Sequence, residues 1–327
     1  MSAAFGTKVQ RTCAGLGAAL ALPVLAQATF PVKPLRMVVS FPAGGPSDVV
    51  ARMLAPRLAE ALGQQVIVEN RAGAGGATGT EFVARSTPDG HTLALGTIGG
   101  ITIAPMLNPK LGYLALRDLA PVTQVVNIAY VLTVHPSVPT KRTKDIIALA
   151  KARPGKLNYG SSGSGTGPHL AGELLKMMAN IQIVHVPYKG SAPALTALMS
   201  GEVDITFENF LIVIPQVKAG RVRPIAMTGI TRSNLMPELP TIAESALPGY
   251  AASGWYGILV PAATPRDVVN KLNAELVRII RSPDISGRLN SMAAEPAPGT
   301  PEEFREFLRA ETDKWARVVK AAGIKAD

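Results

Sequence analysis

Short apolar segments alternate along the chain with longer segments in which apolar residues recur every three or four positions. In the first longer segment Val50, Leu54, Leu58 and Leu62 recur at helical spacing, and Gly63 ends the run. The short segments have the length and apolar content of buried strands, and they cover residues 35–41, 65–70, 91–97, 120–126, 129–136, 156–160, 181–190, 202–209 and 222–229. Repeated strand–helix–strand units predict an α/β fold with a mostly parallel sheet covered by helices on both faces.

The residues after 229 carry two well-signalled helices. Thr264 is expected to cap one helix with Pro265 at its first position, and Thr300 to begin another as a capping box with Glu303. This tail has too few strand-like segments for a sheet of its own, so we expect it to complete the first α/β block. The predicted parts are a signal peptide of residues 1–28, a first lobe of residues 29–125 plus 227–327, and a second lobe of residues 126–226.

This organisation makes the chain cross between the lobes twice, near residues 122–126 and 225–228. Two lobes joined by two strands form a hinge, and the cleft between them is the natural place for a ligand. The predicted architecture is therefore two α/β lobes joined by two hinge-strand crossovers.

The first 28 residues have the pattern of a targeting segment. Lys8 and Arg11 form a short basic region, CAGLGAALALPVLA is an apolar core too short to anchor the chain, and AQA supplies small residues for cleavage near Ala28. An uncleaved helix is the alternative. Cys13, the only cysteine, lies within this segment, so the mature chain has no thiol or disulfide. We expect a soluble protein exported to the periplasm.

Charge and composition narrow the class of partner. The formal net charge is +10, and removal of Lys8 and Arg11 lowers it to +8, which either steers anionic solutes or reflects scattered surface residues. Only 5% of residues are aromatic, and the densest basic cluster, KRTK at 141–144, has no interleaved aromatic residue. We therefore expect no nucleic-acid binding.

Two loops combine glycines with the start of a helix. In SFPAGGPSD, Gly44 and Gly45 allow close backbone approach between a strand and a helix, whose first N–H groups and dipole attract an anion. In NYGSSGSGTGPHL the same arrangement recurs in the other predicted lobe, with hydroxyl groups from Ser161, Ser162 and Thr166. A tight connection and a flexible linker are the alternative interpretations. Two anion-binding loops, one in each lobe, would form a clamp.

A third candidate lies at the end of the strand-like segment VDITFEN. Glu208 and Asn209 occupy the strand's carboxyl end, where ligands gather in open α/β sheets. Asn209 could exchange hydrogen bonds with a ligand, and Glu208 could meet a cation or a bridging water. Local capping of the following helix is the competing explanation.

Catalytic motifs are incomplete. GAGGATG has Thr78 at the third glycine position of a dinucleotide fingerprint, and no phosphate-binding Gly-Lys-Ser/Thr ending occurs. A nucleophile elbow would need glycine where Ser164 stands. His169 and Glu173 have the spacing of metal ligands, but no second pair matches them, so we expect no metal and no cofactor.

Several long motifs resemble one family. The stretch from PVKPLRMVVSFPAGGPSD to TPDGHTLALGT, residues 31–97, is similar to the amino-terminal half of Bug-type substrate-binding proteins of tripartite tricarboxylate transporters. LNYGSSGSGTGPHLAGELLK, IVHVPYKGSAPALTALMSGEVDITFEN and PTIAESALPGY look like the family's later signatures. The resemblance runs from about residue 30 to 325, over nearly the whole mature chain.

The resemblance implies a periplasmic receptor with the two-lobed, type II flytrap fold of binding proteins. Such a receptor closes on a small carboxylated solute, such as a di- or tricarboxylate, an amino acid or an aromatic acid. Loop N–H groups of the first lobe would hold one carboxylate, often with ordered waters. The implied contact residues, carried over position by position, are Phe41, Ala43, Gly44, Gly45, Asp48, Thr97, Ser161, Ser162, Gly163, Thr166, His169, Phe207, Glu208 and Asn209. The family often has aspartate in place of Glu208, and the longer acid is expected to reach further into the cleft. Because Asp48 would repel an anion, we expect it to cap the loop's own N–H groups.

The leading hypothesis is a monomeric, non-enzymatic receptor that delivers a carboxylate to integral membrane transporter subunits. One alternative is an exported hydrolase that uses Ser162 and His169. Another is a sensor that reports the same ligand to a membrane signalling partner. A sensor and a transport receptor would need the same clamp, so the sequence does not separate them. The residues do not identify the carboxylate.

Overall fold

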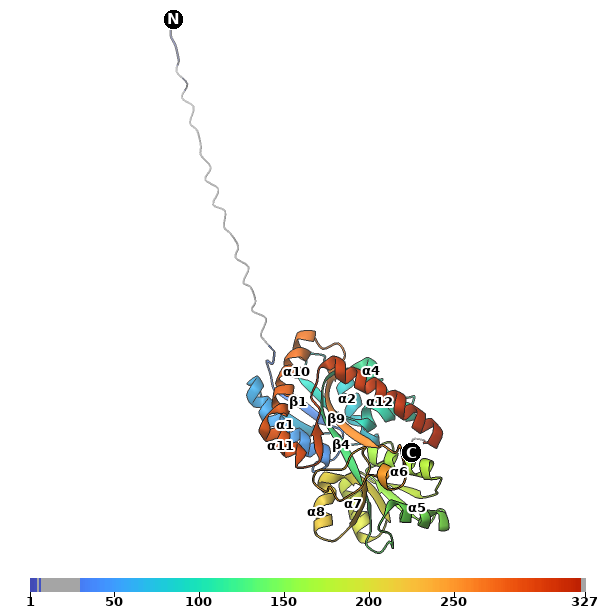
Figure 1. Ribbon diagram of the computed structural model, residues 1–327. Helices are drawn as coiled ribbons and strands as arrows, with labels where there is room; N and C mark the ends of the chain where they lie inside the picture. Colours follow the sequence, from blue (N-terminus) through green and yellow to red (C-terminus); the bar gives the residue numbers. More distant parts are fainter. Residues whose placement is uncertain (5, 7–29, 325–327) are drawn as a thin grey trace. The chain divides into compact units, whose positions relative to one another are not determined.

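The central strand of the computed structural model is β4, which lies between two groups of parallel strands and pairs directly with a strand of one group, while β9 connects it to the other (Figure 1). The structure describes residues 1–4, 6 and 30–324, so the predicted signal peptide lies almost entirely outside the described residues. The strands are β1 (Leu35–Val39), β2 (Val66–Asn70), β3 (Thr92–Thr97), β4 (Leu119–Val134), β5 (Asn158–Ser161), β6 (Val184–Pro187), β7 (Ile205–Asn209), β8 (Arg223–Met227), β9 (Ser253–Pro261) and β10 (Ala294–Pro296).

The sheet is mixed and runs in the order β2–β1–β3–β9–β4–β7–β5–β6, with β8 and β10 also paired to β4. Strands β1, β2 and β3 are parallel to one another, as are β5, β6 and β7. Strand β9 lies antiparallel between β3 and β4, while β7 pairs antiparallel with the later part of β4. We call β1–β3, β9 and the helices packed on them the first lobe, and β5–β8 with their helices the second lobe.

Two strand-like segments, 120–126 and 129–136, were expected in place of β4. The structure instead has one continuous strand, whose register against β9 shifts between Pro121 and Thr123 and again between Gln124 and Val126. Such bulges let a strand bend and accommodate proline, which cannot donate to the ladder. One long strand therefore passes from the first lobe into the second.

The helices fill the connections between strands. They are α1 (Pro46–Leu62), α2 (Ala77–Ala84), α3 (Ala104–Leu107), α4 (Ala115–Asp118), α5 (Thr143–Ala152), α6 (Gly167–Ala179), α7 (Ser191–Ser200), α8 (Phe210–Lys218), α9 (Ile242–Ser245), α10 (Arg266–Arg281), α11 (Pro283–Asn290) and α12 (Pro301–Ala322), with single turns η1 (Ala74–Gly76) and η2 (Gly99–Ile103). No helix among the described residues is long and apolar enough to cross a membrane.

The carboxyl-terminal helices pack on the first lobe. Helix α10 lies against α1 and β4, and α12 lies along β4 and also reaches α6 (Figure 1). Thr300 accepts a hydrogen bond from the Glu303 N–H, which completes the predicted capping box of α12. Helix α10 instead begins at Arg266 with Pro265 as its N-cap, one residue later than expected. Pro31–Asp327 forms one compact unit, so the predicted lobe boundaries stay a prediction.

Candidate functional site

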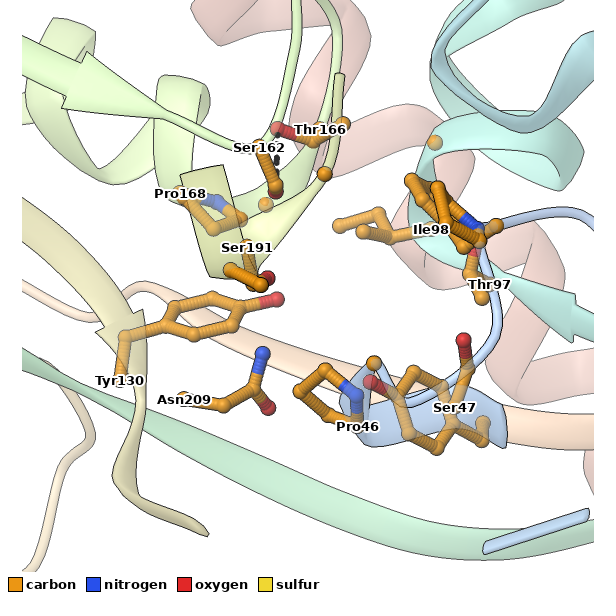
Figure 2. A pocket seen from close by; sticks show the side chains of 18 of the residues that line it. Pro46, Ser47, Thr97, Ile98, Tyr130, Ser162, Thr166, Pro168, Ser191 and Asn209 are labelled. Carbon is orange, nitrogen blue, oxygen red and sulfur yellow. Dashed lines mark hydrogen bonds between the residues drawn. The ribbon is translucent and has the colours of Figure 1, made fainter. Parts of the chain in front are cut away.

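A cavity of about 70 Å³ lies where the carboxyl ends of the parallel strands of both lobes meet. Its walls come from the connections after β1, β3, β5 and β6, from the end of β7, and from the middle of β4 and the start of β9. Figure 2 shows Ser47 and Thr97 on one side and Ser191, Tyr130 and Asn209 on the other. The ends of parallel strands place ligands at this edge in many open α/β sheets.

Three helices begin at this cavity. Gly45, Thr166 and Gly190 are the N-cap residues of α1, α6 and α7, and all three line it. Gly45 and Gly190 have no side chain, and the Thr166 side chain does not cap its own helix with a hydrogen bond. The first N–H groups of a helix have no acceptor within the helix, and they carry the positive end of its dipole. The cavity therefore presents backbone donors to an anion from three directions.

Asp48 holds the connection between β1 and α1 in shape. Its Oδ2 accepts hydrogen bonds from the Gly44 N–H at 2.9 Å and from Arg52 Nε at 2.8 Å, and its Oδ1 accepts one from Asn70 at 2.9 Å. Burial opposes ionisation, but these hydrogen bonds outweigh it and hold the pKa of Asp48 below its ordinary value. Asp48 is buried and does not line the cavity, so it braces the loop, as its position in the sequence suggested. The brace occupies the Gly44 N–H.

The connection between β5 and α6 is held by its own side chains. The Ser162 hydroxyl donates to Thr166 Oγ1 at 3.2 Å, and the Thr166 hydroxyl donates to the Gly163 carbonyl at 2.6 Å. The Gly165 N–H donates to His169 Nδ1 at 3.0 Å. His169 is buried and does not line the cavity, so it braces this loop.

A polar layer lies beneath the same loop. Ser161 Oγ lies 2.6 Å from His185 Nε2, and the His185 ring stacks on His169 with centroids 4.0 Å apart. Tyr159 stacks on His185 and donates to Glu173 Oε1 at 2.6 Å. None of these five side chains lines the cavity. They support the loop from behind.

Ser162 and His169, the residues of the hydrolase alternative, each hydrogen-bond to another group of their own loop. A serine nucleophile needs a hydrogen bond to its base, yet the Ser162 hydroxyl donates to Thr166, and His169 Nδ1 accepts from Gly165. The described residues also contain no group of three or more His, Cys, Asp or Glu side chains placed to hold a metal ion.

Aromatic residues of β4 and β9 complete the cavity wall. Tyr130, Trp255 and Tyr256 line it, and all three are buried. A Cβ added at Gly167 or at Gly254 would lie 1.9 or 2.0 Å from the Tyr130 hydroxyl oxygen. The Tyr130 ring therefore fits only because glycine occupies both neighbouring positions.

Two buried donors in the wall have no partner. Thr97 Oγ1 and Trp255 Nε1 make no hydrogen bond within the described chain, although their residues are only 5% and 1% exposed. Both residues line the cavity. Buried polar groups in native proteins are nearly always hydrogen-bonded, and a polar occupant that reaches either atom would supply its missing partner.

The charge at the cavity is one-sided. No aspartate or glutamate lines it in the part of the chain that the structure describes, whereas Lys189 does. Lys189 also lines a second, outer cavity of about 590 Å³, which shares Phe41, Pro42, Ser162 and Gly190 with the first. Helix starts, unpartnered donors and one lysine suit an anion that bears several oxygen atoms.

The two lobes touch beside the cavity. A Cβ added at Gly75, after β2, would lie 2.5 Å from the Ser164 carbonyl oxygen of the second lobe. A Cβ added at Gly190, before α7, would lie 3.4 Å from the Pro42 ring of the first lobe. The structure therefore shows the two sets of loops in contact across the cleft.

Glu208 lies elsewhere than expected. Its side chain is completely buried and does not line the cavity, because successive residues of a strand point to opposite faces and Asn209 is the one that does. The prediction that Glu208 reaches into the cleft is therefore wrong. Burial raises the pKa of Glu208 to about 7, and the Ser191 hydroxyl and the N–H groups of Asn209 and Ser162 offset only part of this. Neither carboxyl oxygen has a partner with hydrogen-bond geometry.

The sequence-predicted residues divide into two sets. Those that line the first cavity are Phe41, Ala43, Gly45, Thr97, Ser162, Thr166 and Asn209. Those that do not are Gly44, Asp48, Ser161, Gly163, His169, Phe207 and Glu208, and of these Gly163 lines the outer cavity. Phe207 is fully buried against Tyr159.

Sequence reasoning missed several wall residues, among them five with aromatic or polar side chains. Tyr130, Trp255 and Tyr256 come from strands whose apolar pattern carries no mark of a site. Lys189 and Ser191 flank Gly190, where a strand and a glycine precede a helix start, as in the two loops that were identified. That recurring pattern could have identified the third helix start.

A model of the tripartite tricarboxylate transporter family receptor matches residues 50–324. Among solved structures, Rpa4515 of R. palustris with adipate is 36% identical with a TM-score of 0.87, over 90% of this chain and 99% of that one. The periplasmic binding protein BugD is 33% identical with a TM-score of 0.84, over 90% and 99%. MatC (Rpa3494) from Rhodopseudomonas palustris with bound malate is 32% identical with a TM-score of 0.83, over 89% and 100%.

These neighbours have the two-lobed fold of periplasmic solute-binding proteins, and the α/β fold described above is the same. The family match covers most of the chain. This chain belongs to the tripartite tricarboxylate transporter family of receptors, as its Bug-type motifs indicated.

Proposed function

We propose that this protein is a non-enzymatic periplasmic receptor that binds a small carboxylate in the cavity and delivers it to a tripartite tricarboxylate-type membrane transporter. The observation that carries the proposal is the wall of the cavity: three helix starts, two unpartnered buried donors and a lysine, with no lining carboxylate among the described residues. Rpa4515 with adipate and MatC with malate place small dicarboxylates among the solutes of similar proteins.

Export follows from the signal-peptide pattern of residues 1–28, which we propose is cleaved near Ala28. We propose that the mature receptor is a monomer and that its macromolecular partners are the integral subunits of the transporter. We propose that its ligand contacts are the sequence-predicted residues that line the cavity, together with Tyr130, Lys189, Ser191 and Trp255. Sequencing the amino terminus of periplasmic protein tests the first part, because an intact Met1 there would contradict cleavage.

The central test is calorimetric titration of the mature chain with malate, adipate and a panel of mono-, di- and tricarboxylates. A ligand that binds only the folded state stabilises it by about 2.7 kcal/mol at one hundred times its Kd, so a melting-temperature shift should accompany binding. Adipamide, with the length of adipate and no charge, is the matched control and should produce no shift. Absence of binding by the whole carboxylate panel would contradict the proposal.

The Ser162→Ala variant separates a receptor from an enzyme. A receptor that loses one neutral hydrogen bond should bind about 2- to 10-fold more weakly, corresponding to about 0.5–1.5 kcal/mol. A hydrolase that uses Ser162 would turn over an ester substrate in the wild type and lose that turnover entirely. Measurable turnover in the wild type that disappears in this variant would favour the enzyme.

A further inference from the structure

The cavity of about 70 Å³, which we call the inner cavity, adjoins the outer cavity of about 590 Å³. At roughly 10–15 Å³ for each water-sized group, the inner cavity holds a carboxylate group and a few waters. Phe41, Gly99 and Ser162 line both cavities, and Figure 2 labels Ser162 at the edge of the inner one. The outer cavity has the volume of a typical small-molecule site. A longer acid that places its carboxylate in the inner cavity therefore extends into the outer one.

One wall of the outer cavity is a run of six small residues. Residues 72–77, AGAGGA, follow β2, pass through η1 and end at the first residue of α2, and all six line the cavity. None of them has a side chain larger than a methyl group. They belong to the glycine-rich motif that has Thr78 in place of the third glycine of a dinucleotide fingerprint. In this fold the motif leaves space beside the inner cavity.

The other walls of the outer cavity are largely apolar and come from both lobes. Leu107 of α3 and Leu111 line it from the first lobe, and Pro187 and Tyr188 line it from the second. Leu107 reaches across the cleft, because a Cβ added at Gly165 would lie 3.2 Å from Leu107 Cδ1. Apolar walls with few polar groups are typical of sites that bind the carbon skeleton of a ligand.

Charge is confined to the place where the two cavities meet. Lys189 lines both, and it is the only charged side chain that lines either one among the described residues. The other polar side chains at the outer cavity, those of Asn108, Ser162, Ser164 and Tyr188, are neutral. A second carboxylate in the outer cavity would therefore have no cation of its own in the described chain, and burying an unpaired charge is costly.

We propose that the ligand of this receptor is a monocarboxylate with an uncharged, apolar body too long for the inner cavity. Its carboxylate occupies the inner cavity, and its body lies in the outer cavity against Leu107, Leu111 and the small-residue wall. Each methylene that leaves water there adds to the affinity. Malate and adipate are then poorer ligands of this chain than an apolar monocarboxylate. The inference rests on the proposed carboxylate-binding function and specifies its substrate class.

Chain length and charge are tested on the wild-type mature chain by calorimetric titration. The ligands are acetate, butyrate, hexanoate and octanoate, together with suberate, which has the length of octanoate and a second carboxylate. Affinity should rise by about two- to fourfold for each added methylene. Octanoate should bind about tenfold or more tightly than suberate. Affinity that does not depend on chain length, or suberate binding as tightly as octanoate, would overturn the proposal.

The Leu107→Asn variant tests the apolar wall, because asparagine has the shape of leucine and a polar end. Octanoate should bind about fivefold or more weakly to it, whereas acetate, which does not reach the wall, should bind as it does to the wild type. An equal loss for both acids would indicate a defect of cleft closure and would overturn the role of the wall. Leu111→Asn tests the same wall independently, should Leu107→Asn fail to fold.

Leu114→Asn is the matched control. Leu114 is 50% exposed and lines neither cavity, so this variant should bind every acid as the wild type does. The series also separates this inference from the proposed function. If malate, adipate or suberate binds and the long monocarboxylates do not, the receptor function stands and the inference fails. If no mono- or dicarboxylate binds the wild type, the proposed function itself fails.

Discussion

Thr97 shows how a single hydroxyl can mark a binding site. It ends β3 at the cavity, is 5% exposed, and its Oγ1 has no hydrogen-bond partner in the described chain. Desolvating a hydroxyl without a partner costs about 1–3 kcal/mol. A fold bears such a cost more readily where a ligand oxygen completes the hydrogen bond, which is the role that we infer for Thr97.

Replacing this hydroxyl by a methyl group should separate stability from binding. We expect Thr97→Val to fold with unchanged or slightly higher stability, because the unpartnered group is gone, and to bind malate or adipate about 3- to 10-fold more weakly. Calorimetry and thermal melting measure the two effects. Thr264→Val is the matched control, since Thr264 Oγ1 is also buried and unpartnered but lies outside the cavity. Equal affinity in both variants would remove Thr97 from the contacts.

At the scale of elements, the site depends on loops that meet across the cleft. Asp48 and His169 each fix one loop by accepting a backbone N–H hydrogen bond, from Gly44 and from Gly165 respectively. Beside them Gly75 of η1 approaches the Ser164 carbonyl so closely that a Cβ would lie 2.5 Å from it. Rigid loops on both sides and a close contact between them favour a cleft that closes into one defined arrangement.

Gly75→Ala should hinder this closure. An alanine at φ 60° costs about 1–2 kcal/mol, and here its Cβ would also overlap a backbone oxygen of the opposite lobe. We expect carboxylate affinity to fall about tenfold or more, as measured by calorimetric titration. Gly220→Ala provides the comparison, because Gly220 has φ 68° and open space around its Cβ position. Should both variants bind like the wild type, the contact has no part in closure.

At the scale of the whole molecule, Glu208 links stability to pH. The unfolded chain releases this proton near the ordinary pKa of 4.5, whereas the folded chain retains it to about 7. The folded state therefore binds more protons between these values, and the free energy of unfolding falls as pH rises through this window. Above pH 7 the ionised buried carboxyl destabilises the fold by roughly 3 kcal/mol, taking about 1.36 kcal/mol per pKa unit.

Glu208→Gln removes this dependence. We compare the free energy of unfolding of the variant with that of the wild type at each pH. The variant minus wild-type difference should be about 2 kcal/mol larger at pH 8 than at pH 5, whatever the absolute stability of the variant. Urea unfolding of the ligand-free protein at both values measures the difference. A constant difference between variant and wild type at the two pH values would show that Glu208 ionises normally in the folded chain.

The sequence determined much of this protein by local rules. Strand and helix periodicity predicted the α/β fold, the glycine loops before α1 and α6 predicted two of the three helix starts at the cavity, and Asp48 was expected to brace its loop. These features depend on residues that lie close together in the chain. Long motifs in a fixed order also indicated the family.

The tertiary structure decided what comes together from a distance. Tyr130 and Trp255 reach the cavity because β4 passes from the first lobe to the second and β9 returns beside it, a pairing across more than one hundred residues that no local pattern encodes. Strand alternation in β7 turned Asn209 toward the cavity and Glu208 away from it, into an apolar interior without a counter-charge. Burial, which only the packed chain defines, is what gives that acid its raised pKa.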